Sequence, residues 1–398
     1  MTEHHLVPIG DLVTAPDTWN PARVDGDTTF TYVDLAAVDQ NSKVIATPRQ
    51  VLAREAPSRA RQVVAHRDVL VSTVRPNLNA VALVPTSLDR AIASTGFCVL
   101  RPNPTRLDSS YLFHWVKTPE FVSHMVRRAT GASYPAVSDR TVLSSEIPLP
   151  PLPEQQRIAQ TLDQADGLRR KRQSALTRLD LLARSIFLEL FGDPVTNPHG
   201  WPEDTVLDDV ADIMSGITKG RKLAGGATRE VPYLAVVNVQ DRRLDLNTVK
   251  TIEATEAEIS RYQLKLGDLL LTEGGDPDKL GRGSLWNEEI TECIHQNHIF
   301  RVRLAQERIT PLFLNWLIGS ERGKRYFLKS AKQTTGIASI NLRQLRAFPI
   351  LAPPLTLQQR FATAIECVSA LKAEVQHSLA TLDGLLASLQ HRAFGGEL

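Results

Sequence analysis

The sequence predicts an α+β fold made of two similar α+β units in tandem, each followed by one long α-helix. The two helices are expected to pair as an antiparallel coiled coil with pseudo-twofold symmetry. Three observations lead to this prediction: a segment is repeated along the chain, the repeated segment has helical periodicity, and short β-branched runs broken by Gly, Pro and Asn precede each copy. With 398 residues, 42% of them hydrophobic, the chain can bury more than one core.

The repeat connects residues 150–192 with residues 353–395, which align without a gap and are identical at 16 of 43 positions. Weaker echoes at offsets near 200 precede it, which indicates a tandem duplication of the whole chain. These echoes are Tyr32 and Tyr233, Arg61 and Arg261, Asp68 and Asp268, Trp115 and Trp316, and Gly131 and Gly336. The predicted division is an α+β unit at 1–149, a helix at 150–192, a second unit at 193–352 and a second helix at 353–398.

Each α+β unit contains short apolar runs that are typical of strands and one apolar stretch that is typical of a short helix. The Trp residue in each short helix is interpreted as an anchor of the core, because a large buried ring stabilises packing strongly. The matching pairs are the runs at 68–74 and 268–272, those at 97–100 and 299–304, and the helical stretches around Trp115 and Trp316.

The repeated segments have apolar residues three or four positions apart, which predicts one long helix in each copy with an apolar seam. Pro153 suits a first helical turn, and Thr356 with Gln359 forms a capping-box pattern. Gly192 and Gly395 suit the helix ends. Two such helices, each following an α+β unit, would pair most simply in an antiparallel arrangement.

Composition excludes several classes of protein. The chain has 46 basic and 44 acidic residues, which excludes both a highly charged disordered chain and a histone-like basic protein. Cys98, Cys293 and Cys367 are scattered, so neither a disulfide framework nor a structural zinc site is expected. No apolar run reaches the roughly 20 residues that span a bilayer, and no leader peptide is evident at the N-terminus, so the expected location is the cytoplasm.

Known catalytic motifs are also missing. No Asn/Asp-Pro-Pro-aromatic motif of an amino-methyltransferase occurs, and the segment 319–325 lacks the closing Ser or Thr of a phosphate-binding loop. Strand alternation would place Cys293 and His295 on one face and His298 on the other, which argues against a metal site. We therefore expect no catalytic residue, no metal and no cofactor bound by this chain.

The Pro-Pro-Leu-x-x-Gln-Gln-Arg start of a long helix, repeated after two diverged units, resembles the specificity subunit of type I restriction-modification systems (the HsdS family). The most specific stretches are PLPPLPEQQRIAQTLD (148–163), VPYLAVVNV (231–239) and GDLLLT (267–272). The second copy departs from the usual Glu-Gln by having Leu357 before Gln358, although Gln359 and Arg360 remain.

The resemblance implies a non-catalytic DNA-binding subunit with two target recognition domains, 1–149 and 193–352, that read the two halves of a split double-stranded DNA target. The conserved helices would hold the domains apart and dock two modification (methyltransferase) subunits. Those partners would supply S-adenosylmethionine and adenine methylation, and up to two restriction/translocase subunits would supply ATP- and Mg²⁺-dependent translocation and cleavage. Two readers on one side of a duplex need a separation of about one helical turn, ~34 Å.

Candidate DNA-contacting residues are polar side chains in Gly-containing loops, since Arg suits guanine while Asn and Gln suit adenine. They are Arg75, Asn77, Asn79, Ser133 and Tyr134 in the first unit, and Lys219, Arg221, Lys222, Lys279, Arg282, Gln333, Thr334 and Thr335 in the second. The repeated Gln-Gln-Arg is hard to explain by intramolecular packing alone, so it is the candidate docking site for the methylase. Its residues are Gln155, Gln156, Arg157, Gln358, Gln359 and Arg360.

Two other functions remain open from the residues alone. The first is a coiled-coil adaptor whose α+β units bind proteins, and DNA affinity that falls with salt would argue against it. The second is an enzyme of unfamiliar pattern, for which the purified chain alone should modify or cut DNA.

Overall fold

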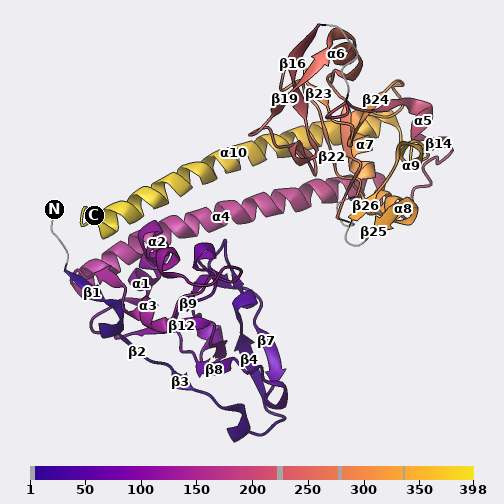
Figure 1. Ribbon diagram of the computed structural model, residues 1–398. Helices are drawn as coiled ribbons and strands as arrows, with labels where there is room; N and C mark the ends of the chain where they lie inside the picture. The colour runs from indigo at the N-terminus through magenta and orange to yellow at the C-terminus, as the bar shows by residue number, and fades with distance from the viewer. Residues whose placement is uncertain (1–4, 222–226, 277–279, 335–336) are drawn as a thin grey trace. The chain divides into compact units, whose positions relative to one another are not determined.

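The computed structural model describes residues 5–221, 227–276, 280–334 and 337–398 (Figure 1). The chain forms two compact units. Unit 1 comprises Met1–Leu176 and Glu374–Leu398, and unit 2 comprises Thr177–Ala373. Each unit therefore contains one α+β domain, one half of the helix that follows it, and one half of the other long helix, so the helices are shared between the units.

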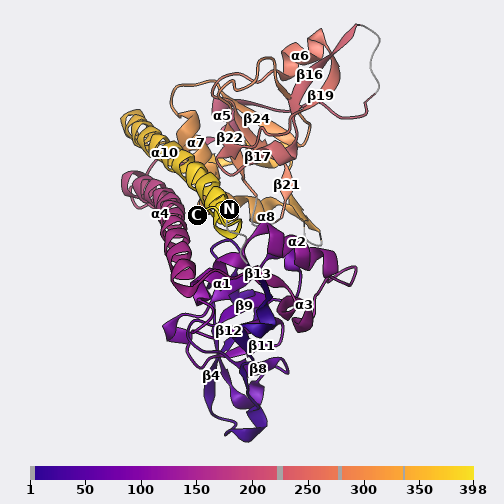
Figure 2. The same ribbon diagram turned by 90° about the vertical axis from the view of Figure 1, so that its left-hand side faces the viewer.

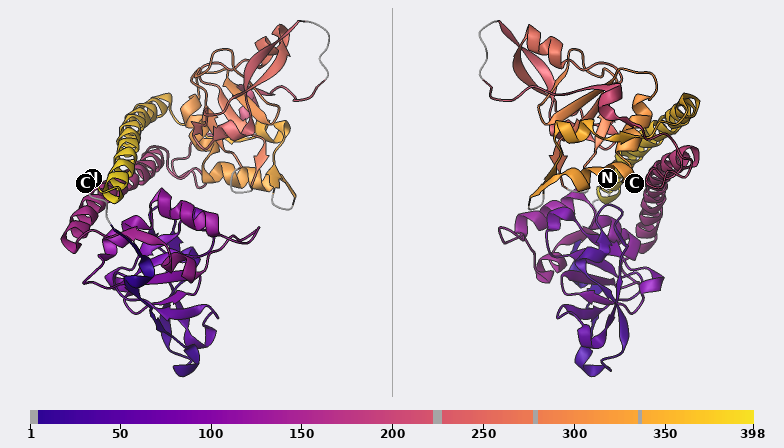
Figure 3. Two further views of the ribbon diagram at one scale, coloured as in Figure 1. Left: turned by 60° about the vertical axis from the view of Figure 1, so that its left-hand side comes forward. Right: turned by 90° about the vertical axis from the view of Figure 1, so that its right-hand side faces the viewer.

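The two long helices are α4 (Leu152–Phe191) and α10 (Leu355–Phe394), each 40 residues long and unbroken (Figure 3). Pro153 lies in the first turn of α4, as predicted. Thr356 is not an N-cap, because α10 begins at Leu355 and the Pro354 carbonyl already accepts the N–H of Gln358. Gly192 ends α4 with a φ of +73°, and a Cβ there would meet Pro198 at 2.5 Å, so this position requires glycine.

Antiparallel pairing of the helices occurs inside each unit. In unit 1, Arg169 Nε of α4 donates to Asp383 Oδ1 of α10 at 2.6 Å. In unit 2, Lys372 Nζ of α10 donates to Asp180 Oδ1 of α4, also at 2.6 Å. The alignment of the repeat matches Arg169 with Lys372 and Asp180 with Asp383. The two ion pairs are thus equivalent, and the expected antiparallel pairing of the two helices is confirmed within each unit.

The described part of the unit 1 domain contains two larger sheets, two two-stranded sheets and three α-helices. Its four-stranded antiparallel sheet has the order β10 (Val81–Leu83), β9 (Val69–Ser72), β12 (Phe97–Pro102), β2 (Val13–Thr14). Its five-stranded sheet has the order β3 (Asp17–Thr18), β8 (Ala60–Val63), β11 (Ile92–Ser94), β4 (Thr29–Val33), β7 (Arg49–Leu52). The remaining elements are the pairs β1 (Leu6–Pro8) with β13 (Glu146–Pro148) and β5 (Val38–Asp39) with β6 (Val44–Ile45), and the helices α1 (Ser109–Trp115), α2 (Pro119–Arg128) and α3 (Asp139–Leu143).

The domain of unit 2 repeats this plan. Its four-stranded antiparallel sheet has the order β22 (Gly283–Leu285), β20 (Leu269–Thr272), β24 (Ile299–Leu304), β15 (Ala211–Ser215). Two three-stranded sheets have the orders β19 (Lys250–Thr255), β16 (Thr228–Leu234), β23 (Ile294–His295), and β21 (Gly274–Gly275), β26 (Ile337–Ser339), β25 (Lys332–Thr334). The other elements are β14 (Thr205–Val206) with β27 (Pro349–Ile350), β17 (Val239–Gln240) with β18 (Arg243–Leu244), and the helices α5 (Leu207–Val210), α6 (Glu256–Tyr262), α7 (Pro311–Ile318), α8 (Glu321–Ser330) and α9 (Leu342–Arg346).

A buried carboxylate shows how closely the two domains correspond. Asp68 precedes β9, and both of its oxygens accept from Arg101 of β12, at 3.1 and 2.9 Å. Asp268 precedes β20 and accepts from Arg303 of β24 in the same two-pronged way, at 2.7 Å for both contacts. Both carboxylates are buried, so the paired guanidinium compensates for their lost hydration. The duplication inferred from the sequence is therefore present in the fold.

The domain of each unit packs against the long helices through one short helix: α1 lies beside α4 in unit 1, and α7 lies beside α10 in unit 2 (Figures 1 and 2). In unit 2 the contact is a cluster of rings. The ring centroid of Trp316 lies 5.6 Å from that of Phe187 and 5.3 Å from that of Phe361. In unit 1, Trp115 contacts Phe394 at 5.1 Å. Both Trp residues thus belong to the hydrophobic packing, as expected.

Unit 1 adds charged contacts at the same interface. His114 of α1 is buried and bonds to Asp163 of α4, with 2.8 Å between Nε2 and Oδ1. Lys117 forms an ion pair with Asp166 one turn further along α4, at 3.3 Å. The repeat places Ser369 where Asp166 stands, so unit 2 lacks this second ion pair. Burial lowers the pKa of His114, which favours the neutral ring.

The Cys293, His295 and His298 segment is divided between the core and the surface. Cys293 and His295 are buried, whereas His298 is exposed. Within the described ranges, no three His, Cys, Asp or Glu side chains are grouped as metal ligands. The same part of the chain contains no helix that is long and apolar enough to cross a membrane.

Acid is expected to destabilise unit 2 through His295. Burial lowers the pKa of this imidazole to about 4, while its Nδ1–H donates to the Ile299 carbonyl at 3.0 Å. In the unfolded chain His295 has its ordinary pKa near 6.5. Between pH 6.5 and 4 the unfolded chain therefore binds a proton that the folded chain does not. The contribution of His295 to the free energy of unfolding is fully present above pH 6.5 and falls as the pH drops towards 4. Denaturant titrations between pH 7 and 4 measure this slope.

The matched variant for this titration is His295→Gln, which removes the titrating group from a site that also faces Tyr262, Asp268, Arg301 and Arg303. Its acid slope should be shallower than that of the unchanged chain. Unit 1 should keep an acid slope of its own, because its His114 is also buried with a lowered pKa. Equal slopes in the two proteins would contradict the assignment to His295.

Candidate nucleic-acid interface

Two loops of unit 1 converge at the end of strand β9. Arg75 and Asn79 both adopt left-handed backbone conformations, with φ of 49° and 46°, on either side of the short 3-10 turn Pro76–Leu78. The N–H of Arg75 donates to the carbonyl of Pro135 at 2.7 Å, and its guanidinium lies over the ring of Tyr134, 4.6 Å from the centroid. The structure thus brings together two predicted residues that are 59 positions apart in the sequence.

This surface is open to solvent. Tyr134 is 69% exposed, and Arg75, Asn77 and Ser133 are also exposed. Gly131 allows the loop to turn back, with a φ of +102°. A planar guanidinium beside an exposed aromatic face is suited to hydrogen bonding and stacking with nucleobases.

Asn79 differs from its neighbours because its backbone is tied to the domain. Its carbonyl accepts a hydrogen bond from Lys43 Nζ at 2.5 Å, from the hairpin of β5 and β6. Burial, together with the nearby charges of Lys117 and Arg169, lowers the pKa of Lys43 to about 8. Lys43 therefore fixes the end of the turn that carries Arg75 and Asn77.

The described part of unit 2 has the equivalent strands, with β21 following β20 and β25 paired with β26. Gln333 and Thr334 lie in β25, whose backbone pairs with β26. Lys219 is exposed, and Arg282 is partly buried and donates to Gln240 Oε1 at 3.2 Å. Three predicted contacts lie outside the described residues: Lys222, Lys279 and Thr335.

Arg221 requires a correction. Its Nε and Nη2 donate to the two carboxylate oxygens of Glu258, at 2.6 and 2.8 Å, and Nη2 also donates to the Glu253 carbonyl. The guanidinium N–H groups that would bind a guanine are occupied within the protein. Arg221 connects α6 to the loop after β15 and is removed from the candidate DNA contacts. Its acidic partner is 37 positions away in the sequence and gives no local signal.

Gln155 and Gln358 also require a correction, because they are only 1% and 0% exposed. Gln155 Oε1 accepts the N–H of Asp108 at 2.9 Å, and its Nε2 donates to the carbonyls of Arg106 and Pro150. The repeat makes the same three bonds from Gln358, to Thr310, Arg308 and Pro353. These amides join each long helix to its own domain, which explains their identity in both copies without a partner.

The other repeated polar residues remain on the surface of the helices. Gln156, Arg157, Gln359 and Arg360 are all exposed. Arg157 forms an ion pair with Glu154 at 2.6 Å, a contact that the second copy cannot make because Leu357 replaces the glutamate. The candidate docking surface therefore consists of these four exposed residues.

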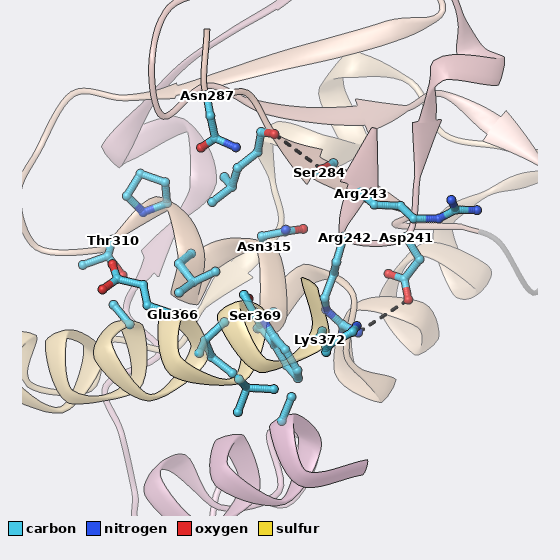
Figure 4. Close-up of a pocket in the computed structure, with 18 of the residues that line it drawn as sticks. Asp241, Arg242, Arg243, Ser284, Asn287, Thr310, Asn315, Glu366, Ser369 and Lys372 are labelled. Carbon is cyan, nitrogen blue, oxygen red and sulfur yellow. Dashed lines mark hydrogen bonds and ion pairs between the residues drawn. The ribbon is translucent and has the colours of Figure 1, made fainter. Parts of the chain in front are cut away.

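A pocket of about 960 Å³ in unit 2 lies between its domain and its helix halves (Figure 4). Arg242 of the β17–β18 hairpin stacks on Trp316, with its guanidinium carbon 4.0 Å from the ring centroid, and forms an ion pair with Asp241 at 3.4 Å. Burial lowers the pKa of Arg242. Glu366 and Lys372 of α10 also line the pocket, so it offers charges of both signs. No sequence motif marked this site, since its residues come from six separate segments.

Known proteins resemble this chain in sequence and in fold. Residues 64–178 match the family model of the type I restriction modification DNA specificity domain. The StySPI specificity subunit of Salmonella potsdam is 24% identical over 319 residues, covering 76% of this chain and 68% of the relative. The EcoKI specificity subunit of Escherichia coli K12 is 24% identical over 326 residues, with the same coverage of both chains.

Solved structures agree with these relatives. A chain from a study of complex assembly and conformational transition in the type I R-M system is 25% identical, with full coverage of this chain, 99% coverage of its own length and a TM-score of 0.60. The S subunit from M. genitalium, 14% identical, covers 99% of this chain and 97% of its own, with a TM-score of 0.56, and shares the fold. In the matched domain, in sequence and in fold, the chain is thus similar to the specificity subunits of type I restriction-modification systems.

Proposed function

We propose that the chain is the non-catalytic, sequence-specific DNA-binding subunit of a type I restriction-modification complex, in which each domain reads one half of a bipartite target. The observation that carries this proposal is the exposed Arg75–Tyr134 pair at the end of β9. The duplicated fold supports a second reading surface at the equivalent end of β20 in unit 2.

The chemistry of the loop in unit 1 fits the major groove. The five donors of Arg75 can bind guanine O6 and N7 together, and the amide of Asn77 can bind adenine N6 and N7. Stacking on Tyr134 restricts the guanidinium before DNA binds, so less rotamer freedom is lost on binding. Lys219 in unit 2 is exposed and suits a phosphate contact.

The proposed partners provide the catalysis. Two modification subunits would bind S-adenosylmethionine and methylate adenine, and restriction subunits would bind ATP and Mg²⁺, with no cofactor on this chain. The long helices would set the spacing of the half-sites and present the docking surface of Gln156, Arg157, Gln359 and Arg360. The duplication supports this assignment, because it supplies two similar helix faces for two copies of one partner.

The reading function predicts that deleting the gene removes one split methyladenine motif from the genome. Arg75→Ala should leave methylation in place but relax one position of one half-site, because a bidentate contact contributes about 1–3 kcal/mol of discrimination, or roughly 5- to 150-fold. Arg75→Lys keeps the charge but loses the fork, so it should relax the same position. Base-resolution mapping of methyladenine measures each outcome.

Arg23→Ala is the matched control for this map, since Arg23 is an exposed arginine of the same domain outside the two loops. It should leave the motif unchanged. An unchanged motif in Arg75→Ala would remove Arg75 from the contacts, and an unchanged map after deletion of the gene would contradict the reading function itself.

Docking of the methylase is expected to depend on the repeated arginines. Changing both Arg157 and Arg360 to Glu reverses the charge at equivalent exposed positions and should release the modification subunit while the chain stays folded. Co-purification measures the loss, with Arg178→Glu, exposed in the middle of α4, as the control. Survival of the complex in the double variant would show that the arginines do not dock it.

A further inference from the structure

We propose that Glu273 and His298 of unit 2 form a base-reading pair whose carboxylate accepts a hydrogen bond from the exocyclic amino group of an adenine or a cytosine. This inference rests on the proposed DNA-reading function and names a specificity-determining contact within it. Neither residue was a candidate from the sequence, because 25 positions separate them.

The first support is the contact itself. His298 Nδ1 lies 2.5 Å from Glu273 Oε2. A carboxylate only accepts hydrogen bonds, so the imidazole carries its proton on Nδ1 and donates it. This hydrogen bond uses Oε2 of Glu273 and sets the orientation of the carboxylate. Oε1 remains as a second acceptor.

The second support is the rigid placement of Glu273. It directly follows strand β20, its N–H donates to the His298 carbonyl at 3.0 Å, and its own carbonyl accepts the N–H of Ile340 at 2.9 Å. The next residue, Gly274, packs so closely on β26 that a Cβ would meet the Ala338 carbonyl oxygen at 2.9 Å. The carboxylate thus extends from a fixed backbone, with no side chain on the residue that follows it.

The third support is the position in the duplicated fold. In unit 1 the same backbone frame is occupied by Thr73, whose N–H donates to the Gly96 carbonyl and whose carbonyl accepts the N–H of Val137, both at 2.9 Å. Thr73 is buried, and the exposed Arg75 is only two residues further along the chain. The pair therefore lies at the end of β20, where unit 1 has its own candidate contacts, and it differs between the units as two readers of different half-sites require.

The chemistry selects the ligand class. Glu273 is 33% exposed and His298 is 55% exposed, so both can reach a bound molecule. Phosphate oxygens repel a carboxylate. A carboxylate that loses its hydration on binding DNA needs a hydrogen-bond donor in return, and on a base edge that donor is an amino group. In the major groove these amino groups are N6 of adenine and N4 of cytosine.

The test is a binding cycle with the complex of this chain and its modification subunit. The DNA is a duplex carrying the mapped target, and each adenine or cytosine of the target is replaced in turn by purine or 2-pyrimidinone, which lack the amino group. For the unchanged protein, one such replacement should weaken binding by about tenfold or more. For Glu273→Ala the same replacement should have little effect, since the contact is already lost.

Glu273→Gln keeps the shape of the side chain and so separates an effect on folding from an effect on recognition. The control is Glu307→Gln, which changes an exposed acid of the same unit and should behave like the unchanged protein. Adenine and cytosine are distinguished by which analogue gives the effect. Equal penalties at every position in the unchanged and Glu273→Ala proteins would overturn the proposal. Failure of the proposed function looks different, because then the unchanged protein would not prefer the target duplex over unrelated DNA.

Discussion

Replacing Phe187 with alanine is expected to lower the free energy of unfolding of unit 2 by about 3–5 kcal/mol, the usual cost of removing a buried phenylalanine. Phe187 contacts four other rings, with centroids 5.1–6.0 Å apart. Two belong to α7 of the domain, one to α10, and one is the next turn of α4. The cavity would therefore separate all three elements at once, and denaturant unfolding monitored by tryptophan fluorescence measures the loss.

The matched control is Leu188→Ala, which removes the adjacent side chain of the same helix. Leu188 is 51% exposed, so its loss should change stability by no more than about 0.5 kcal/mol. Since Phe187 joins the reading domain of unit 2 to the helices, its alanine variant should also lose methylation of the split target at raised temperature. Equal stabilities of the two variants would show that the ring cluster does not hold this interface.

Replacing Gln358 with alanine is expected to destabilise unit 2 by about 3 kcal/mol, although the side chain is polar. Three hydrogen bonds are lost, and the N–H of Thr310 and two carbonyls are left without their partner in a largely dry interface. Each unsatisfied buried group typically costs about 1–3 kcal/mol, and relaxation recovers part of the sum. The same substitution at Gln155 should destabilise unit 1 to a similar degree.

The adjacent glutamines provide the controls for this prediction. Gln359 and Gln156 differ from Gln358 and Gln155 by one position and are exposed, so alanine there should leave the midpoint of unfolding within error. A result in which Gln358→Ala is as stable as Gln359→Ala would mean that the buried amide contributes no net stability. Loss of the methylase with unchanged stability in Gln358→Ala would instead restore its predicted docking role.

The sequence predicted the helices and the duplication well, because the repeat records the same packing constraints twice. It could not show in which direction a repeated polar residue points. Gln358 and Gln359 are both repeated and both amides, yet one satisfies backbone groups in the interior and the other faces solvent. Identity between the copies reports a shared constraint, and only the three-dimensional contacts show whether that constraint is internal.

Sequence alone offers candidate contacts where a single loop carries the signal. Arg75 and Asn77 are such candidates because a polar turn follows an apolar strand, whereas pairs from distant segments give no such pattern. The sequence indicates a DNA contact for Arg221 because its partner Glu258 is remote, and for the same reason it does not predict that Glu273 pairs with His298. Side-chain pairing across a fold has no periodic pattern in the sequence.

The sharing of the helices gives the chain an unusual order of assembly during translation. Unit 2 is continuous from Thr177 to Ala373, so all of its residues have been synthesised before the last part of α10. Unit 1 needs Glu374–Leu398 as well, because Ala393 is buried in its core and Phe394 packs on Tyr111 and Trp115. Domains usually mature on the ribosome from the N-terminus onward. In this chain the first domain is expected to complete its core only after residues 374–398 have been made.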